Sequence, residues 1–154
     1  MEYGTIEREV RIDASPATVF EVLTSPEHLK EWWPDEAVLE PTPGARGHLV
    51  FGAPGSANAH VPQVTVVDAV PDQRFSFRWT HPEDEAARPG NSLLVVFELT
   101  PSGDGTILRM TESGFREMGW EVAVLEEQYR DHAEGWAHYL PRLVAYAGRV
   151  EVGA

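Results

Sequence analysis

The sequence contains no cysteine and only one lysine among its 154 residues. Without cysteine, the chain has no disulfides, thiol nucleophiles or thiolate metal ligands. The one lysine, Lys30, stands in an acidic segment and gives little support to Schiff-base chemistry. No apolar run approaches the roughly 18 residues that span a bilayer. The N-terminus also lacks the basic and apolar regions of a secretory signal, so we expect a cytoplasmic location.

The charge is strongly one-sided, with 25 acidic residues against 12 basic ones and a formal net charge of -13. Such a surface repels phosphate backbones and anionic lipids, so we expect neither nucleic acid nor a membrane surface as a partner. The simplest interpretation of the charge is solubility rather than an acidic docking role. The hydrophobic share of 42% is typical of a folded protein, and the length favours a single domain over residues 1–154.

The predicted elements begin with one strand and two short helices. Residues 5–13 alternate apolar and charged side chains, which is typical of a strand. Ser15 and Ser25 each precede a proline and an apolar stripe, which predicts short helices over residues 15–23 and 25–33, each with a serine cap. Five later segments with alternating apolar residues are predicted strands: 46–52, 61–70, 74–80, 92–100 and 107–113.

A long amphipathic helix is predicted at the end of the chain, from about residue 120 to residue 150. Apolar residues recur there at intervals of three and four, while charged residues take the other face. A run of strands with segregated helices indicates an α+β fold with an antiparallel sheet. The long helix must bury its apolar stripe against that sheet. Because a strongly curved sheet cannot contact one helix everywhere, we expect a pocket between them.

The segment "EREVRIDASPATVFEVLTSPEHLKEWWP" resembles the opening of the START-like (SRPBCC) superfamily. Its two "SP" helices and its closing "WWP" resemble the branch related to the activator of heat-shock protein 90 ATPase, the AHSA-like branch. "VVDAVPDQRFSFRW" and "EGWAHYLPRLVAY" resemble the strand-turn-strand and the closing helix of that branch. The resemblance covers nearly the whole chain. It implies a helix-grip fold, in which a curved antiparallel sheet wraps around a long C-terminal helix, with two short helices after the first strand and an apolar cavity.

Aromatic side chains are the main candidates for the wall of that cavity. Trp32 and Trp33 stand three and four residues beyond Leu29, so both can border one helix face. Aromatic stripes usually form core, and their assignment to a cavity follows from the resemblance rather than from spacing. The ligand-binding residues implied in this way are Trp32, Trp33, Phe51, Phe77, Trp79, Phe97, Met110, Tyr129, His132 and Trp136.

Two charged residues stand in apolar registers of predicted strands. Arg8 lies between Ile6 and Val10 on one face, and Glu112 follows Met110 in phase. The resemblance makes the first and last strands neighbours, so we expect the two charges to be able to pair. In one interpretation both side chains reach solvent at strand ends. In the other they form a polar anchor for a ligand carbonyl or hydroxyl.

The histidines give no sign of a metal site. None of the six shows the HExxH spacing, and His132 and His138 fall on different faces of the predicted helix. We therefore predict neither a metal nor a cofactor. His132 lies one turn before Trp136, so it can face the pocket as a general acid or base, although a histidine with a purely structural role is more common.

The leading functional hypothesis is a module that binds a small hydrophobic molecule, without committed catalysis. One alternative, implied by the resemblance, is an enzyme similar to polyketide cyclases, aromatases or hydrolases, in which Arg8, His132 or Glu112 moves protons. A second alternative is a co-chaperone whose acidic surface docks on a chaperone ATPase, although the named activators carry an additional domain. Exposed Trp33 or Tyr146 offers a contact for a homodimer, but nothing in the sequence requires one.

Overall fold

One antiparallel sheet organises the chain. The computed structural model describes residues 3–53 and 55–153, and within them seven strands pair in the order β1-β7-β6-β5-β4-β3-β2. Every neighbouring pair is antiparallel, which confirms the predicted α+β class. The strands are β1 (Thr5–Ile12), β2 (Glu36–Val38), β3 (Arg46–Val50), β4 (Gln63–Val70), β5 (Arg74–His81), β6 (Leu93–Ser102) and β7 (Gly105–Ser113).

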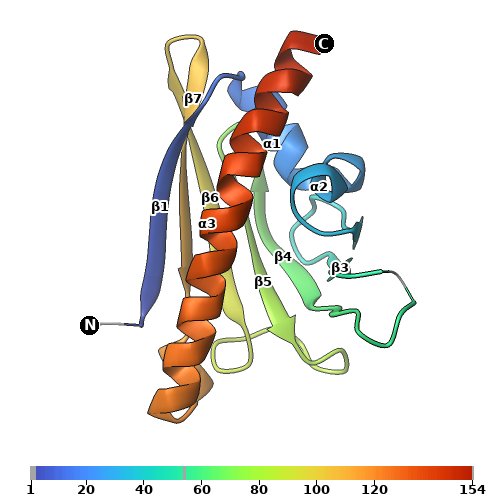
Figure 1. Cartoon of the computed structure of the whole chain (residues 1–154), viewed down its shortest axis with the longest axis vertical. Coiled ribbons are helices and arrows are strands. Elements are labelled where there is room, and N and C mark those ends of the chain that lie inside the picture. Colours follow the sequence, from blue (N-terminus) through green and yellow to red (C-terminus); the bar gives the residue numbers. More distant parts are fainter. Residues whose placement is uncertain (1–2, 54, 154) are drawn as a thin grey trace.

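Two short helices follow β1, and a long helix closes the fold. They are α1 (Pro16–Thr24), α2 (Pro26–Trp32) and α3 (Val122–Gly153), and a short 3-10 turn, η1 (Arg116–Met118), precedes α3. In Figure 1, α3 crosses the face of the sheet, and α1 and α2 lie beside its C-terminal half. This arrangement confirms the predicted helix-grip fold. No helix in the described part of the chain is long and apolar enough to cross a membrane.

The observed element boundaries correct the sequence prediction in two places. The prediction missed β2, because a strand of three residues is too short to show a period of two. Ser25 does not cap α2 with its side chain; instead its N–H donates to the Glu21 carbonyl at 2.9 Å and ends α1. Ser15 does cap α1 as expected, since its hydroxyl accepts from the Thr18 N–H at 3.2 Å.

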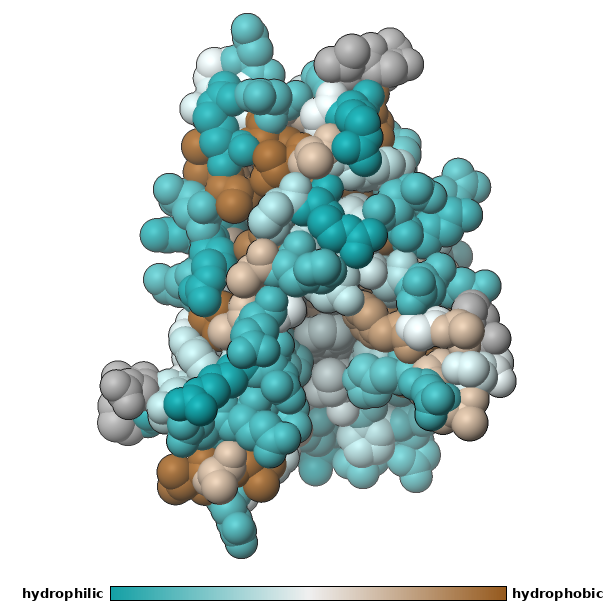
Figure 2. Space-filling view, viewed as in Figure 1, coloured by the Kyte–Doolittle hydropathy of each residue, from teal (hydrophilic) through white to brown (hydrophobic). Residues whose placement is uncertain are grey.

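The long helix α3 buries one side against the sheet and leaves the other in solvent. Trp136, Leu140, Leu143 and Ala147 are buried, and their spacing of three and four residues puts them on one face. Figure 2 shows hydrophilic residues over most of the outward side of this helix. Pro141 lies inside α3 without ending it. The amphipathic pattern therefore determines which α3 residues face the sheet.

Large aromatic side chains fill the core between the sheet and the helices. Phe75, Phe77 and Phe97 point inward from β5 and β6 and are at most 2% exposed. Burying one such side chain contributes about 1.5–3 kcal/mol. Trp32 joins this core with 0% exposure. Its Nε1 donates to the Val22 carbonyl at 3.2 Å, so its polar atom has a partner.

The end of α3 is tied to the beginning of α1. The Glu151 carboxylate accepts a hydrogen bond from the Ser15 N–H at 3.2 Å and another from the Thr18 hydroxyl. A carboxylate is favourable there because the first N–H groups of a helix have no partner within the helix. The Thr18 hydroxyl, followed by the Ser15 N–H, holds the pKa of Glu151 below its ordinary value of 4.5.

Glu151→Gln is expected to remove a pH-dependent part of the stability. Because the pKa of Glu151 is lower in the folded than in the unfolded chain, its contribution is fully present above about pH 4.5. The contribution is lost as the pH falls through the folded-state pKa. Urea unfolding should show a difference in free energy between wild type and variant at neutral pH that shrinks under acidic conditions. Glu127→Gln, exposed on the same helix, is the control; a Glu151 difference that stays constant with pH contradicts the assignment.

Candidate functional site

A cavity of about 390 Å³ lies between α3, the end of β5 and the residues that follow α2 and β3. Five aromatic side chains belong to its wall: Trp33, Phe51, Trp79, Trp136 and Tyr139. The remaining lining residues are His60, Thr80, Gln128, Asp131, His132 and Gly135. An apolar wall with a few polar groups is the usual composition of a site for a small molecule.

Trp33 stands at the centre of the aromatic wall. Its ring centroid lies 5.3 Å from that of Trp79, 5.4 Å from that of Trp136 and 6.0 Å from that of Phe51. α2 ends here because Pro34 disfavours helical backbone in the residue before it. Trp33 is only 7% exposed, so the expectation that it offers an exposed contact for a dimer is wrong. The "WWP" sequence thus ends the helix and leaves its second tryptophan in the cavity wall.

A buried carboxylate stands behind three of the lining residues. Glu112, on β7, is 0% exposed. Its Oε1 accepts from Trp136 Nε1 at 2.8 Å and its Oε2 accepts from Trp79 Nε1 at 2.8 Å. His132 Nδ1 lies 3.0 Å from Oε1 and 2.9 Å from Oε2. We call these four residues the Glu112 cluster; it joins β5, β7 and α3.

The donors around Glu112 suit an ionised carboxylate. An indole N–H can only donate and an ionised carboxylate can only accept, so the indole N–H groups and both oxygens have partners. Among the described residues, the third side chain that contacts the carboxylate of Glu112 is the imidazole of His132, not an arginine or a lysine. A buried charge without such partners is strongly destabilising. These partners make the burial of the Glu112 carboxylate tolerable in the folded protein.

An irregularity in β5 brings a further polar side chain to the cavity. The pairing with β4 passes from Val64–Trp79 to Gln63–His81, so Thr80 is an extra residue in β5, a β-bulge. Thr80 has a φ of 71°, a left-handed value that is strained for a β-branched residue. Trp79 and Thr80 both line the cavity, although successive residues of a regular strand face opposite sides.

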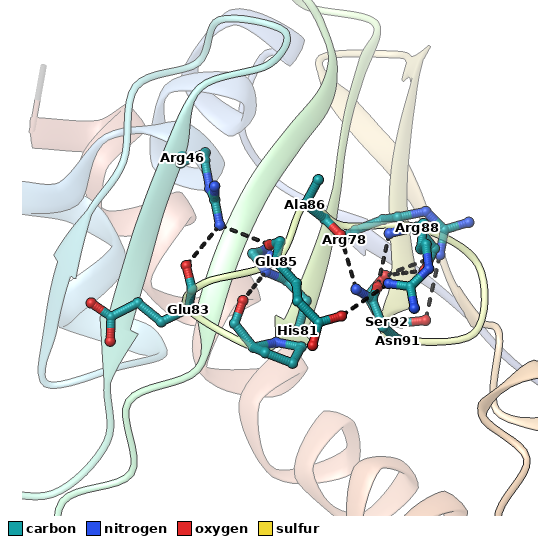
Figure 3. Close-up of polar contacts among 10 residues, drawn as sticks. Arg46, Arg78, His81, Glu83, Glu85, Ala86, Arg88, Asn91 and Ser92 are labelled. Atoms are coloured by element: carbon teal, nitrogen blue, oxygen red, sulfur yellow. Dashed lines mark hydrogen bonds and ion pairs between the residues drawn. The ribbon is translucent and has the colours of Figure 1, made fainter.

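The connection after the bulge is held near the sheet by polar contacts (Figure 3). The Arg46 guanidinium donates to the carbonyls of Glu83 and Glu85 at 3.0 and 2.8 Å. The Asn91 side chain donates to the Ala86 carbonyl at 2.9 Å. These contacts hold the segment between β5 and β6 next to the end of β5 that reaches the cavity.

A larger depression, of about 520 Å³, is a weaker candidate for a ligand site. Its described lining residues include Arg78, Pro89, Ser113 and Glu117, without an aromatic side chain or any member of the Glu112 cluster. Ligand sites more often combine apolar walls with a small number of convergent polar groups. The smaller cavity has that combination, so we take it as the candidate site.

The cavity brings together part of the predicted ligand-binding set. The predicted residues that line it are Trp33, Phe51, Trp79, His132 and Trp136. Those that lie in the core are Trp32, Phe77, Phe97 and Met110. Tyr129 lies toward β1, where its hydroxyl donates to the Thr5 carbonyl at 3.0 Å. An inward position on the sheet therefore does not by itself place a side chain at the cavity, because α1, α2 and α3 cover most of that face.

Arg8 and Glu112 do not pair: Arg8 reaches solvent, as one of the two interpretations expects, whereas Glu112 is buried and fits neither. Arg8 is exposed and donates to the Glu7 carbonyl at 2.7 Å. In the ladder between β1 and β7, Arg8 stands opposite Met110, while Ile6 stands opposite Glu112. β1 is an edge strand, so a long side chain there can reach solvent. The polar group beside the cavity is thus His132, which is hydrogen-bonded to the buried Glu112, while Arg8 lies elsewhere.

Sequence reasoning missed several of the lining residues, and the reasons differ. Gln128, Asp131 and Gly135 share the α3 stripe of His132 at intervals of three and four, so helical spacing could have found them. They were missed because polar residues and glycine do not mark an apolar face. Thr80 reaches the cavity through the bulge, and a bulge leaves no reliable signal in one sequence. His60 lies in a loop, and an isolated antiparallel β-bridge pairs it with Phe51, which also lines the cavity.

Comparison with known protein families agrees with the fold and the opening motif. The profile of the family described as Activator of Hsp90 ATPase homolog 1-like protein matches residues 13–148. The chain belongs to this family. The AHSA-like resemblance is thereby confirmed, and the matched range contains the whole Glu112 cluster. Among curated proteins, no sequence matches this AHSA1-like chain significantly.

Solved structures share the AHSA1-like fold over almost the full length. Protein MLL2253 from Mesorhizobium loti is 24% identical, with a TM-score of 0.74 over 94% of this chain and 97% of its own. CV1439 from Chromobacterium violaceum is 21% identical, with a TM-score of 0.71 over 94% of this chain and 98% of its own. The Aha1 dimer from Colwellia psychrerythraea is 20% identical, with a TM-score of 0.70 over 97% of each chain. At these identities the likeness shows the fold alone.

Glu112→Gln is expected to lower the free energy of unfolding by about 1–3 kcal/mol. The amide offers one oxygen where the carboxylate offers two, and its NH2 group then faces a donor. Urea unfolding followed by circular dichroism measures the loss. Glu98→Gln, exposed on the neighbouring strand β6, is the matched control and should change stability by less than about 0.5 kcal/mol. A loss at Glu112 no larger than that at Glu98 contradicts the described network.

Proposed function

We propose that the chain binds a small, neutral and mainly apolar molecule with a ring system in the cavity beneath α3. The observation that carries this proposal is the aromatic wall of Trp33, Phe51, Trp79, Trp136 and Tyr139. Aromatic side chains favour other rings in stacked or edge-on contacts at about 4.5–7 Å. The volume of about 390 Å³ lies within the range of about 300–1,000 Å³ that is typical of ligand pockets.

The geometry of the wall supports binding because its rings are already fixed. Glu112 accepts from the indoles of Trp79 and Trp136 at 2.8 Å, and Trp33 packs against both. A preorganised site loses less side-chain entropy when a ligand enters. Charge narrows the ligand class further. Asp131 lines the cavity and the chain carries a net charge of -13, so an anionic ligand is disfavoured relative to a neutral one.

A second candidate function, a proton-transfer enzyme, is favoured by one observation. A carboxylate 2.9 Å from an imidazole nitrogen can orient the ring and stabilise its protonated form, and His132 lines the cavity. The reaction would be limited to moving protons on the bound molecule. The rate at which 2-tetralone takes up deuterium, followed by NMR in D2O, separates the two candidates. A faster rate with the wild type than with His132→Phe favours the enzyme. Equal rates with the two proteins favour the binding module.

Gly135 allows the cavity to be filled without damage to the fold. It lines the cavity from α3, and a Cβ at this position would meet no other atom within 4 Å. Gly135→Leu should weaken the binding of N-phenyl-1-naphthylamine, a neutral fluorescent probe, by at least about tenfold, because the leucine takes the space of the probe. The same variant should gain about 0.5–1 kcal/mol in stability, since glycine disfavours the helix.

Gly148→Leu is the matched control for this variant. Gly148 also lies in α3 with room for a Cβ, but it lies outside the cavity. It should gain similar stability and keep the affinity of the wild type. Fluorescence titration gives the affinities, and thermal unfolding with and without the probe gives the stabilities. The proposed function fails if the wild type shows no saturable binding, or if Gly135→Leu binds as well as the wild type.

A further inference from the structure

The hydrogen bonds of Glu112 determine which nitrogen of His132 carries its proton. Two of the donors to Glu112 are the indole N–H groups of Trp79 and Trp136, and both of its oxygens also lie within 3.0 Å of His132 Nδ1. An ionised carboxylate has no proton to give, so the imidazole must donate from Nδ1. In a neutral imidazole with a proton on Nδ1, the other nitrogen, Nε2, is a hydrogen-bond acceptor.

The Nε2 atom of His132 is the part of the ring that is left for a ligand. His132 lines the cavity, and its side chain keeps 15% exposure. Within the described residues, its hydrogen bonds to protein groups run from Nδ1 alone. Packing also limits rotation of the ring, because Trp79 and Phe115 lie edge-on to it with centroids 5.4 and 5.5 Å away. The acceptor therefore keeps one orientation.

Asp131, the residue before His132, is a second hydrogen-bond acceptor beside the cavity. Both residues lie in α3. An ionised carboxylate accepts hydrogen bonds and cannot donate them. Two adjacent residues of α3 that line the cavity thus carry acceptor atoms. A ligand that brings a donor satisfies such atoms better than a ligand that brings another acceptor.

We infer that His132 selects ring-containing ligands that carry a hydroxyl donor, such as a phenol or an enol, and that Glu112 is the positioning residue for this selection. The inference rests on the proposed function, since it concerns the same cavity. A hydroxyl can donate to His132 Nε2 when it replaces water there. An ether of the same shape removes the water and leaves the nitrogen without a partner, which is the situation in which polar sites discriminate strongly.

The test compares 2-naphthol with its methyl ether, 2-methoxynaphthalene, by calorimetric titration. The wild type should bind the naphthol at least about tenfold more tightly than the ether. His132→Phe keeps a ring of similar size but has no acceptor, so its ratio should fall to about one or below. The extra methyl group of the ether adds the same apolar surface in both proteins. The comparison of the two ratios therefore isolates the hydrogen bond.

A second measurement needs neither a ligand nor a variant. Nitrogen-15 NMR of the free wild-type protein distinguishes a protonated from an unprotonated imidazole nitrogen, and we expect His132 to be protonated at Nδ1 and unprotonated at Nε2. A proton on Nε2 overturns the inference even if His132→Phe does not fold. Equal binding of naphthol and ether by the wild type overturns the inference and leaves the proposed function standing. Failure of both compounds to bind removes the proposed function and this inference together.

Discussion

The hydrogen bonds to the Glu112 carboxylate are the interaction on which the site depends. They join residues that are 20 to 33 positions apart in the chain and that come from β5, β7 and α3. A carboxylate with no exposure is tolerated only with such partners. Because the donors are themselves cavity residues, the bonds that make the buried charge tolerable also orient the cavity wall. Stability and site geometry have a common origin here.

The cavity exists because α3 packs closely on the sheet over only part of its length. Leu140, Leu143 and Ala147 are buried in the C-terminal half of the helix, beside α1 and α2. In the preceding turns Gly135 has no side chain, and the polar residues Gln128, Asp131 and His132 line the cavity. Side chains of this part of α3 therefore do not fill the space. Trp33, which follows α2, borders it and contacts Trp136 of α3.

The fold was predictable from the sequence because its signals are local. The Ser-Pro sequences before the two short helices, the period of two in the strands and the amphipathic pattern of the long helix can each be recognised from neighbouring residues. The family profile over residues 13–148 agrees with the predicted fold. The site was predictable only in part. The apolar register marked Glu112 as unusual, but its true partners depend on the strand order and on α3, so Arg8 was the wrong partner. The bulge at Thr80 depends on the pairing of β5 with β4, which one sequence does not reveal.

In the folded protein, the carboxylate of Glu112 accepts hydrogen bonds from the indole N–H groups of Trp79 and Trp136, and the geometry of the site depends on these two bonds. Hydrogen exchange of the indole protons, followed by NMR, tests these bonds most directly. The Trp79 and Trp136 protons should exchange only through global unfolding, far more slowly than that of Trp120, which is half-buried. Exchange of either proton as fast as that of Trp120 would contradict the presence of these bonds.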